Sequence, residues 1–357
     1  MASLWLTLFS LGLICLGCIA EPTLVQEPEF ECVPMYEQPA LQLPLMKNHQ
    51  IQMKPSRELL SVLSTSNNDT TTKIILKGSK GCSKGQVPVH KPKTNVTDNL
   101  IYPQQLTKDY NQHYAIIKTF GDTITKWSGA QALFNIIKPP VAKNQYSRVW
   151  IWLNYNVMSS IQFGVAVDTI LYRDNRPRLT TYWMSDKQQN GCYNALCPGG
   201  YVQVHKSIYP GMIFDKVSVP GGIQHTFHLS VAEDPVTKNW VLTTGTIMIG
   251  YWPRQAYMAK GAGEVYFGGF AGTASPRVLS PPMGTGDFPT KDLTRSCFMK
   301  QLKYVIPGYT LEDINSNEME YYVNNQKCYG VMFLKYVDYD SRETLTFGGP
   351  GGYCPIR

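Results

Sequence analysis

Apolar and polar residues alternate along two adjacent stretches in the middle of the chain, at 149–157 and 161–171. In the second stretch one alternate set is largely apolar: Ile161, Phe163, Val165, Val167, Thr169 and Leu171. The opposite set mixes small and polar residues: Gln162, Gly164, Ala166, Asp168 and Ile170. A period of two with β-branched and aromatic residues predicts strands, and the Ser-rich break at 158–160 predicts a turn. We therefore expect a hairpin with one core-facing side and one side that can accept another chain.

Short apolar runs separated by turn signals fill most of the chain after residue 110, and no long helical pattern interrupts them. Strands at this spacing without crossover helices predict an all-β fold, an antiparallel β-sandwich or barrel. The predicted strands are 114–120, 132–137, 149–157, 161–172, 179–184, 201–205, 227–232, 240–244, 247–251, 264–267, 302–305, 329–337 and 344–347.

Residues 21–107 do not follow this pattern and are interpreted as a small N-terminal unit. Helix-like apolar spacing at 59–63 is followed by a polar tract at 64–72, and a charged, Pro-broken linker precedes residue 107. The sandwich is therefore predicted to occupy 108–357. Residues 1–20 are apolar and end in Ala20, which is typical of a secretory signal peptide.

Export would give the mature chain an extracellular location, in the apoplast or cell wall, and no later stretch is apolar enough to span a bilayer. Asn68 and Asn95 begin N-glycosylation acceptor patterns in predicted loops. Seven cysteines remain after the signal, so one stays unpaired, and sequence alone does not choose the pairs. The close spacing of Cys192 and Cys197 favours a local disulfide over a zinc site.

The charged residues exclude some function classes. The chain has 33 Lys and Arg against 26 Asp and Glu, spread without a dense basic run, which argues against nucleic acid as a partner. Motifs of serine hydrolases, zinc peptidases and phosphate-binding loops are absent. His225 and His228 would point to opposite faces of a strand, so packing is favoured over metal binding, and no metal or cofactor is expected.

Several blocks of sequence together resemble the neprosin family of plant secreted glutamic peptidases. Residues 30–56, FECVPMYEQPALQLPLMKNHQIQMKPS, are similar to its activation peptide. Further blocks follow in family order: GCSKGQVPV at 81–89, DNRPRLTTYWMSD at 174–186, GCYNALCPG at 191–199, GYWP at 250–253, PMGTGDFP at 282–289 and GGPGGYCP at 348–355. The resemblance covers nearly the whole mature chain. It implies a pro-region, a β-sandwich, and a cleft in which two glutamates cleave peptide bonds near proline at acid pH.

Both family glutamate positions differ in this chain. The first glutamate lies in an I-E-x-G motif that matches 161–164, where Gln162 replaces it. The second ends a V-x-W-G-G-E motif that matches 265–270, where Phe270 replaces it. An amide can donate a hydrogen bond to an oxyanion, but neither an amide nor a phenyl ring can transfer a proton at a useful pH. No catalytic residue is therefore assigned.

Other features of the family site are expected to persist. Aromatic side chains suit rigid proline rings, and five are candidates to line the cleft, although the sandwich core is favoured for any single one: Tyr182, Trp183, Trp240, Tyr251 and Trp252. The resemblance also implies three disulfides and leaves Cys297 unpaired. These disulfides are Cys192–Cys197 and Cys328–Cys354 in the sandwich and Cys32–Cys82 in the pro-region.

The favoured hypothesis is a secreted neprosin-family protein whose glutamic (prolyl) endopeptidase site is disabled or strongly weakened, and which binds Pro-rich extracellular polypeptides. The alternative is an active acid glutamic endopeptidase made as a zymogen and cleaving near proline. The intact pro-region favours this alternative, although such a region can also serve as a folding aid. A polysaccharide-associated wall protein is the third hypothesis and rests only on basic charge and export. The sequence does not determine the oligomeric state.

Overall fold

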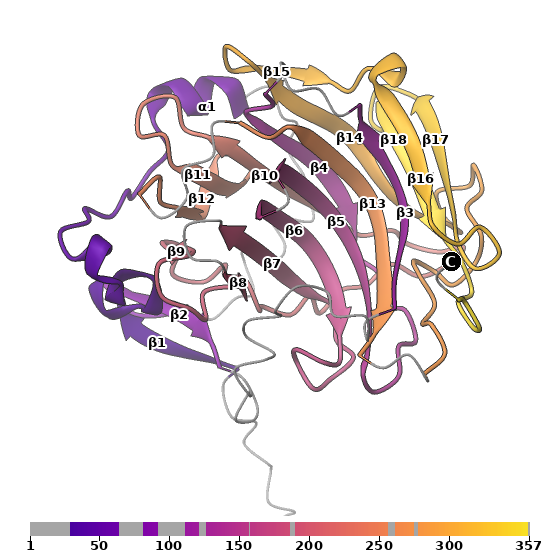
Figure 1. The fold of residues 1–357 in the computed structure, drawn as a ribbon, viewed down its shortest axis with the longest axis horizontal. Helices are drawn as coiled ribbons and strands as arrows, with labels where there is room; N and C mark the ends of the chain where they lie inside the picture. The colour runs from indigo at the N-terminus through magenta and orange to yellow at the C-terminus, as the bar shows by residue number, and fades with distance from the viewer. Residues whose placement is uncertain are drawn as a thin grey trace, which may run out of the picture.

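The computed structural model describes residues 29–63, 81–91, 111–120, 126–156, 158–185, 190–255, 261–274 and 278–355. Two antiparallel sheets form a sandwich, and an N-terminal region lies at one side of it (Figure 1). The predicted all-β fold with a small N-terminal region is confirmed. The signal peptide, the boundary at residue 107, Asn68 and Asn95 lie outside the described residues.

One sheet has seven strands, ordered β16 (Met319–Val323), β3 (Gln112–Thr119), β13 (Glu264–Thr273), β5 (Gln145–Asn156), β6 (Ser159–Asp168), β7 (Arg178–Ser185) and β8 (Asn190–Tyr193). The other sheet runs β17 (Gly330–Tyr336), β18 (Glu343–Gly348), β14 (Cys297–Ile306), β4 (Gly129–Asn135), β10 (Thr226–Glu233), β11 (Trp240–Thr244), β12 (Ile247–Trp252) and β9 (Val202–Gln203), with β15 (Thr310–Asp313) beside β14. A short 3₁₀ helix, η4 (Ser316–Glu318), precedes β16.

The alternation along β6 determines which face of the seven-stranded sheet is packed against the other sheet. Ile161, Phe163 and Val165 are buried in the inter-sheet core. The Phe163 ring lies 6.0 Å from the ring of Phe134 on β4. Because successive side chains of a strand point to opposite faces, Gln162 lies on the face turned away from this core. We call that surface the Gln162 face.

Strand β13 continues to Thr273, six residues beyond the predicted end at Phe267. The prediction stopped there because Gly268 and Gly269 are common strand breakers. A Cβ on Gly268, whose φ is +143°, would lie 2.4 Å from the Ala115 carbonyl oxygen of β3, and one on Gly269 would lie 2.4 Å from the Met283 sulfur. The glycines therefore permit close packing within the sandwich and leave the strand intact.

The N-terminal region contains a hairpin, three 3₁₀ turns and one helix. They are β1 (Phe30–Pro34), β2 (Gln86–His90), η1 (Met35–Glu37), η2 (Pro39–Gln42), η3 (Pro44–Met46) and α1 (Arg57–Leu63). Leu59 and Leu63 of α1 are fully buried in a cluster on the outer face of the nine-stranded sheet. This agrees with the helical spacing seen in the sequence. None of the described helices is both long and apolar enough to cross a membrane.

His228 on β10 predicts how stability depends on pH. The side chain is 3 % exposed, its Nδ1 accepts a hydrogen bond from the Gly245 N–H at 3.0 Å, and burial lowers its pKa to about 4. The unfolded chain binds a proton below about pH 6.5, so the stabilisation is present above that pH and is lost as the pH falls toward 4. The loss is up to about 1.4 kcal/mol for each pH unit.

His228→Asn is therefore expected to flatten the pH dependence of the free energy of unfolding, because its Oδ1 can accept the same hydrogen bond without titrating. Urea denaturation between pH 7 and pH 4 measures this slope. An unchanged slope in the variant would refute the assignment to His228.

Candidate functional site

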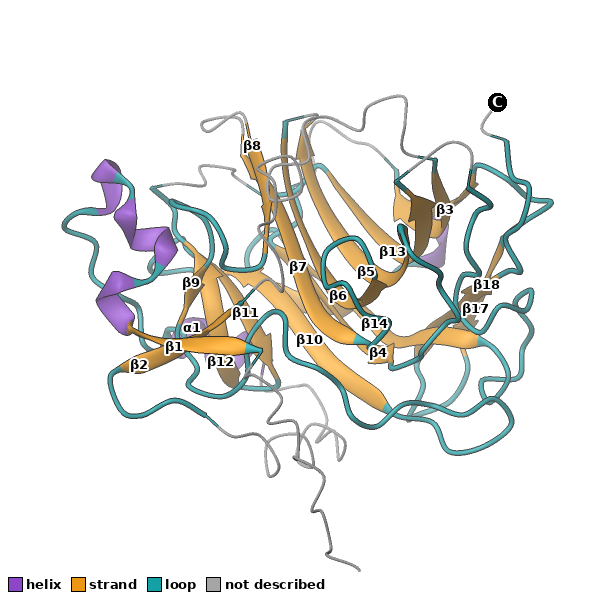
Figure 2. Cartoon of the chain, turned by 90° about the horizontal axis from the view of Figure 1, so that it is seen from below, coloured by secondary structure: helices purple, strands orange, loops and turns teal. Residues whose placement is uncertain are grey.

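Gln162 and Phe270 lie on the same face of the seven-stranded sheet. In the strand register Gln162 is opposite Trp152, and Phe270 is opposite Arg148, four residues earlier on the same strand β5. Side chains four residues apart on a strand share a face. Figure 2 shows β7, β6, β5 and β13 side by side in this sheet. The two family positions therefore belong to one surface, with β5 between them.

The Gln162 amide has no hydrogen-bond partner among the residues that the structure describes. The residue is 7 % exposed and lies between two aromatic residues in register, Trp152 on β5 and Tyr182 on β7. Neither amide atom is among the fully buried side-chain atoms that lack a partner, so the amide keeps contact with solvent. The Gln162 amide is therefore able to donate a hydrogen bond to a ligand and to accept one from it.

Phe270 fills the second family position with packed apolar surface. It is 1 % exposed, and its ring centroid lies 5.4 Å from Tyr114, 6.1 Å from Trp152 and 6.3 Å from Trp150. Together with Ile116 these rings form a separate small cluster on the Gln162 face. The position therefore contributes to packing and provides no group that exchanges protons.

The three carboxylates that this face carries within the described ranges are each paired with a cation. Asp168 is 1 % exposed, lies 2.6 Å from Arg148 Nη2, and accepts backbone N–H groups of Ile170 and Leu171. Glu264 and Glu320 both pair with Lys118, at 3.1 and 2.7 Å. No proton is shared between carboxylates in this arrangement.

Of the three carboxylates on this face, Glu264 lies nearest to Gln162 in the strand register. It is opposite Asn154, which is opposite Ser160, so it lies two strands, about 10 Å, across from β6. Burial would raise the pKa of Glu264, but hydrogen bonds from Tyr266, Asn154 and Lys118 hold it below its ordinary value. This carboxylate therefore stays ionised and is a poor proton donor.

Four of the five aromatic residues considered for the cleft lie elsewhere, so the assignment of these four to the cleft is wrong. Trp183, Trp240 and Trp252 are buried in the inter-sheet core, and Tyr251 belongs to the cluster beneath the N-terminal region. Trp183 follows Tyr182 on β7 and so points to the opposite face. Only Tyr182 is on the Gln162 face. Besides Phe270, other rings that point to the same side of the sheet as Tyr182 lie there: Tyr114, Trp150, Trp152, Tyr193 and Tyr266.

The cysteine pairs are those that the family resemblance implies. The structure contains Cys32–Cys82, Cys192–Cys197 and Cys328–Cys354, and Cys297 is free and buried. Within the described residues no group of three His, Cys, Asp or Glu side chains could hold a metal ion.

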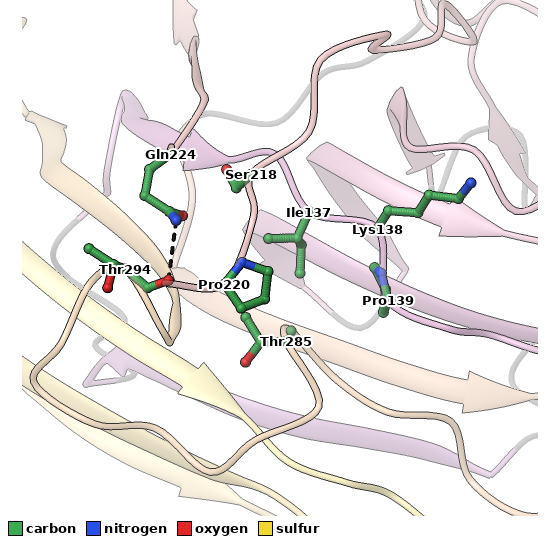
Figure 3. Close-up of a pocket in the computed structure, with 9 residues that line it drawn as sticks. Ile137, Lys138, Pro139, Ser218, Pro220, Gln224, Thr285 and Thr294 are labelled. Carbon is green, nitrogen blue, oxygen red and sulfur yellow. Dashed lines mark hydrogen bonds between the residues drawn. The ribbon is translucent and has the colours of Figure 1, made fainter. Parts of the chain in front are cut away.

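A small cavity lies apart from the Gln162 face, where the loops that precede β10 and β14 meet the end of β4 (Figure 3). Its volume is about 60 Å³, and it is lined by Ile137, Lys138, Pro139, Ser218, Pro220, Gln224, Gly284, Thr285 and Thr294. Gln224 Nε2 donates to the Thr294 carbonyl oxygen at 3.2 Å across one side. Since liquid water occupies about 30 Å³ per molecule, the space suits one or two waters and is too small for a peptide.

The fold and site define a two-sheet β-sandwich protein with an attached N-terminal region and an aromatic face around Gln162. Family comparison matches residues 143–350 to Neprosin and residues 28–120 to the Neprosin activation peptide. The chain therefore belongs to the neprosin family. The activation-peptide match extends over β3, which is an internal strand of the seven-stranded sheet.

Two solved structures show weaker likeness. One is scytalido-glutamic peptidase with a peptide-based transition-state analogue, at 10 % identity and TM-score 0.37, covering 68 % of this chain and 98 % of that one. The other is the CBM40 of the Ruminococcus gnavus IT-sialidase bound to α2,6-sialyllactose, at 9 % identity and TM-score 0.22, covering 46 % and 92 %. At these scores neither likeness bears on the activity of this chain.

Proposed function

We propose that this protein is a secreted, non-cleaving member of the neprosin family that binds extended, Pro-rich polypeptides on the Gln162 face. The observation that carries the proposal is the replacement of both family glutamates, by an amide at Gln162 and a buried ring at Phe270. Peptide hydrolysis by this family's route needs one group that takes a proton and another that gives one. Neither residue can do either.

The chemistry of the Gln162 face suits a proline-containing chain. Proline has no N–H, so such a segment offers carbonyl acceptors, and the unpartnered Gln162 Nε2 can donate to one of them. Aromatic rings at Trp152 and Tyr182 flank that amide and offer faces for stacking on pyrrolidine rings. Secretion is supported by the apolar N-terminal stretch, the three disulfides and the activation-peptide region.

An active acid endopeptidase remains the alternative, because the N-terminal region is retained and Glu264 lies on the same face as Gln162. Its ionised state and its pairing with Lys118 argue against it as the catalytic acid. The two functions differ in one observable: the alternative requires new peptide ends, and the proposal requires binding without them.

A synthetic Pro-rich peptide is expected to bind the native chain in isothermal titration, and Tyr182→Ala is expected to weaken its affinity roughly 2- to 12-fold, the value of one aromatic contact. Tyr339→Ala removes an equal ring that is 70 % exposed between β17 and β18, and should leave affinity unchanged. Absence of heat at about millimolar peptide, or equal effects of the two substitutions, would refute binding on this face.

A further inference from the structure

The N-terminal region is held against the sandwich by contacts that span its whole described length. We infer that residues 29–91 stay bound to the sandwich as a separate, noncovalent chain after the segment that joins them, 92–110, is cut. The partner surface is the outer face and edge of the nine-stranded sheet around β9 to β12, next to which β1, β2 and α1 lie in Figure 1, together with Arg178 at the start of β7 in the other sheet. This inference is independent of what the Gln162 face binds.

The Gln38 side chain docks on the exposed edge of the nine-stranded sheet. It is fully buried, its Oε1 accepts the Gln203 N–H at 2.7 Å, and its Nε2 donates to the Gln203 carbonyl at 3.1 Å. An edge strand presents backbone groups that need partners, and this amide satisfies the donor and acceptor of one residue. Without the region, the N–H and the carbonyl of Gln203 would lose these partners.

A second contact fixes the start of α1. Asp234, in the β10–β11 turn, accepts hydrogen bonds from Gln52 Nε2 and from the Ser56 N–H, each at 2.8 Å. Ser56 Oγ in turn accepts the Leu59 N–H at 3.0 Å, which is the N-cap interaction of the helix. The sandwich therefore orients the helix through its cap.

Apolar side chains form a further part of the interface. Leu59 and Leu63 pack into a cluster with sandwich residues Val202, Val204, Ala232, Val241, Met248, Tyr251 and Val305. His49 Nε2 also lies 2.6 Å from the Tyr251 hydroxyl. Without the region these seven side chains would form an exposed apolar patch, which monomeric proteins rarely present.

Charge anchors the other end of the region at β7. Glu29 pairs with Arg178 at 2.9 Å and with Arg176, and Arg178 is 1 % exposed. Cys32–Cys82 joins the two described parts of the region to each other, and no disulfide within the described residues joins them to the sandwich. The region is therefore one cross-linked piece held without a covalent bond apart from the chain itself.

The test uses the full chain with a site-specific protease sequence inserted between residues 92 and 110. After cutting at neutral pH without reductant, both pieces are expected to co-elute in gel filtration at about 1 µM, as a complex of submicromolar dissociation constant does. Gln38→Ala should release the N-terminal piece about tenfold faster or more, since two buried backbone groups lose their partners. Glu29→Gln serves as a second variant, also expected to release faster, should Gln38→Ala fail to fold.

Gln42→Ala is the matched control, since Gln42 lies in the same segment and is exposed, and its side chain bonds, among the described residues, to the Glu37 carbonyl alone. The N-terminal piece of this variant should be released at the same rate as that of the cut chain without the substitution. Separate elution of the two native pieces after cutting would overturn the inference, and so would equal release rates in Gln38→Ala, Glu29→Gln and Gln42→Ala.

Discussion

The double variant Gln162→Glu/Phe270→Glu is expected to cleave a Pro-rich protein at acid pH at least about 100-fold faster than the native chain, because positioned proton transfer typically contributes 10²–10⁴ in rate. Position 270 lies among the rings of Tyr114, Trp150 and Trp152, so burial would raise the pKa of a carboxyl placed there and keep it protonated. Arg148, opposite this position, is already paired with Asp168. A carboxylate at position 162 would act as the base.

The controls separate proton chemistry from polarity. Gln162→Glu/Phe270→Gln introduces the same polar bulk into the cluster without a second acid, and should stay at the native rate. The two single glutamate variants show whether one carboxylate beside an amide suffices. If the double variant folds, by circular dichroism, yet cleaves no faster than the Phe270→Gln control, the two positions are not the catalytic ones.

Asp168→Ala is expected to lower the free energy of unfolding by about 3–5 kcal/mol, since it leaves a buried guanidinium without its counter-charge. Arg148 and Asp168 side chains are 7 % and 1 % exposed, and Asp168 also holds two backbone N–H groups at the end of β6. Arg148 lies against the Tyr146 and Trp150 rings, at 4.1 and 4.4 Å from their centroids. Loss of the pair would therefore disturb the base of the Gln162 face.

Glu264→Ala is the matched comparison for this prediction. It removes the same charge from the same face, but the Lys118 and Glu264 side chains are 22 % and 21 % exposed, and such pairs contribute about 0–1 kcal/mol. Urea denaturation of both variants measures the difference. Equal losses in the two variants would contradict the view that the Arg148–Asp168 pair is a structural element of the face.

Local alternation was sufficient to predict β5 and β6, but it missed the part of β13 that carries Phe270. The apolar set at 161, 163 and 165 correctly placed Gln162 on the opposite face, and the helical spacing at 59–63 corresponds to α1. The strands β1 and β2 escaped prediction because each is short and contains a proline, and their pairing is a nonlocal contact closed by Cys32–Cys82. Pairing of this kind has no local signature in sequence.

The composition of the site depended on register, which a single sequence does not specify. Trp183 is next to Tyr182 in the chain, yet its side chain points to the opposite face of the sheet, into the core. Glu264 is six residues from Phe270 along β13, yet strand pairing through Asn154 and Ser160 places it two strands across from β6, near Gln162. Distances judged along one strand missed this neighbour, since cross-strand spacing is about 5 Å while six residues span about 20 Å.

The most direct measurement of the central claim is an acid digest of a Pro-rich protein, analysed by mass spectrometry for new peptide ends. The digest is run with the purified native chain and with the chain that carries the inserted protease sequence and has been cut between residues 92 and 110. We predict no new ends in either form, because Gln162 and Phe270 leave the face without a proton-transferring pair. Cleavage by the native chain that disappears in Glu264→Gln would contradict this account and make Glu264 the acid of an active peptidase.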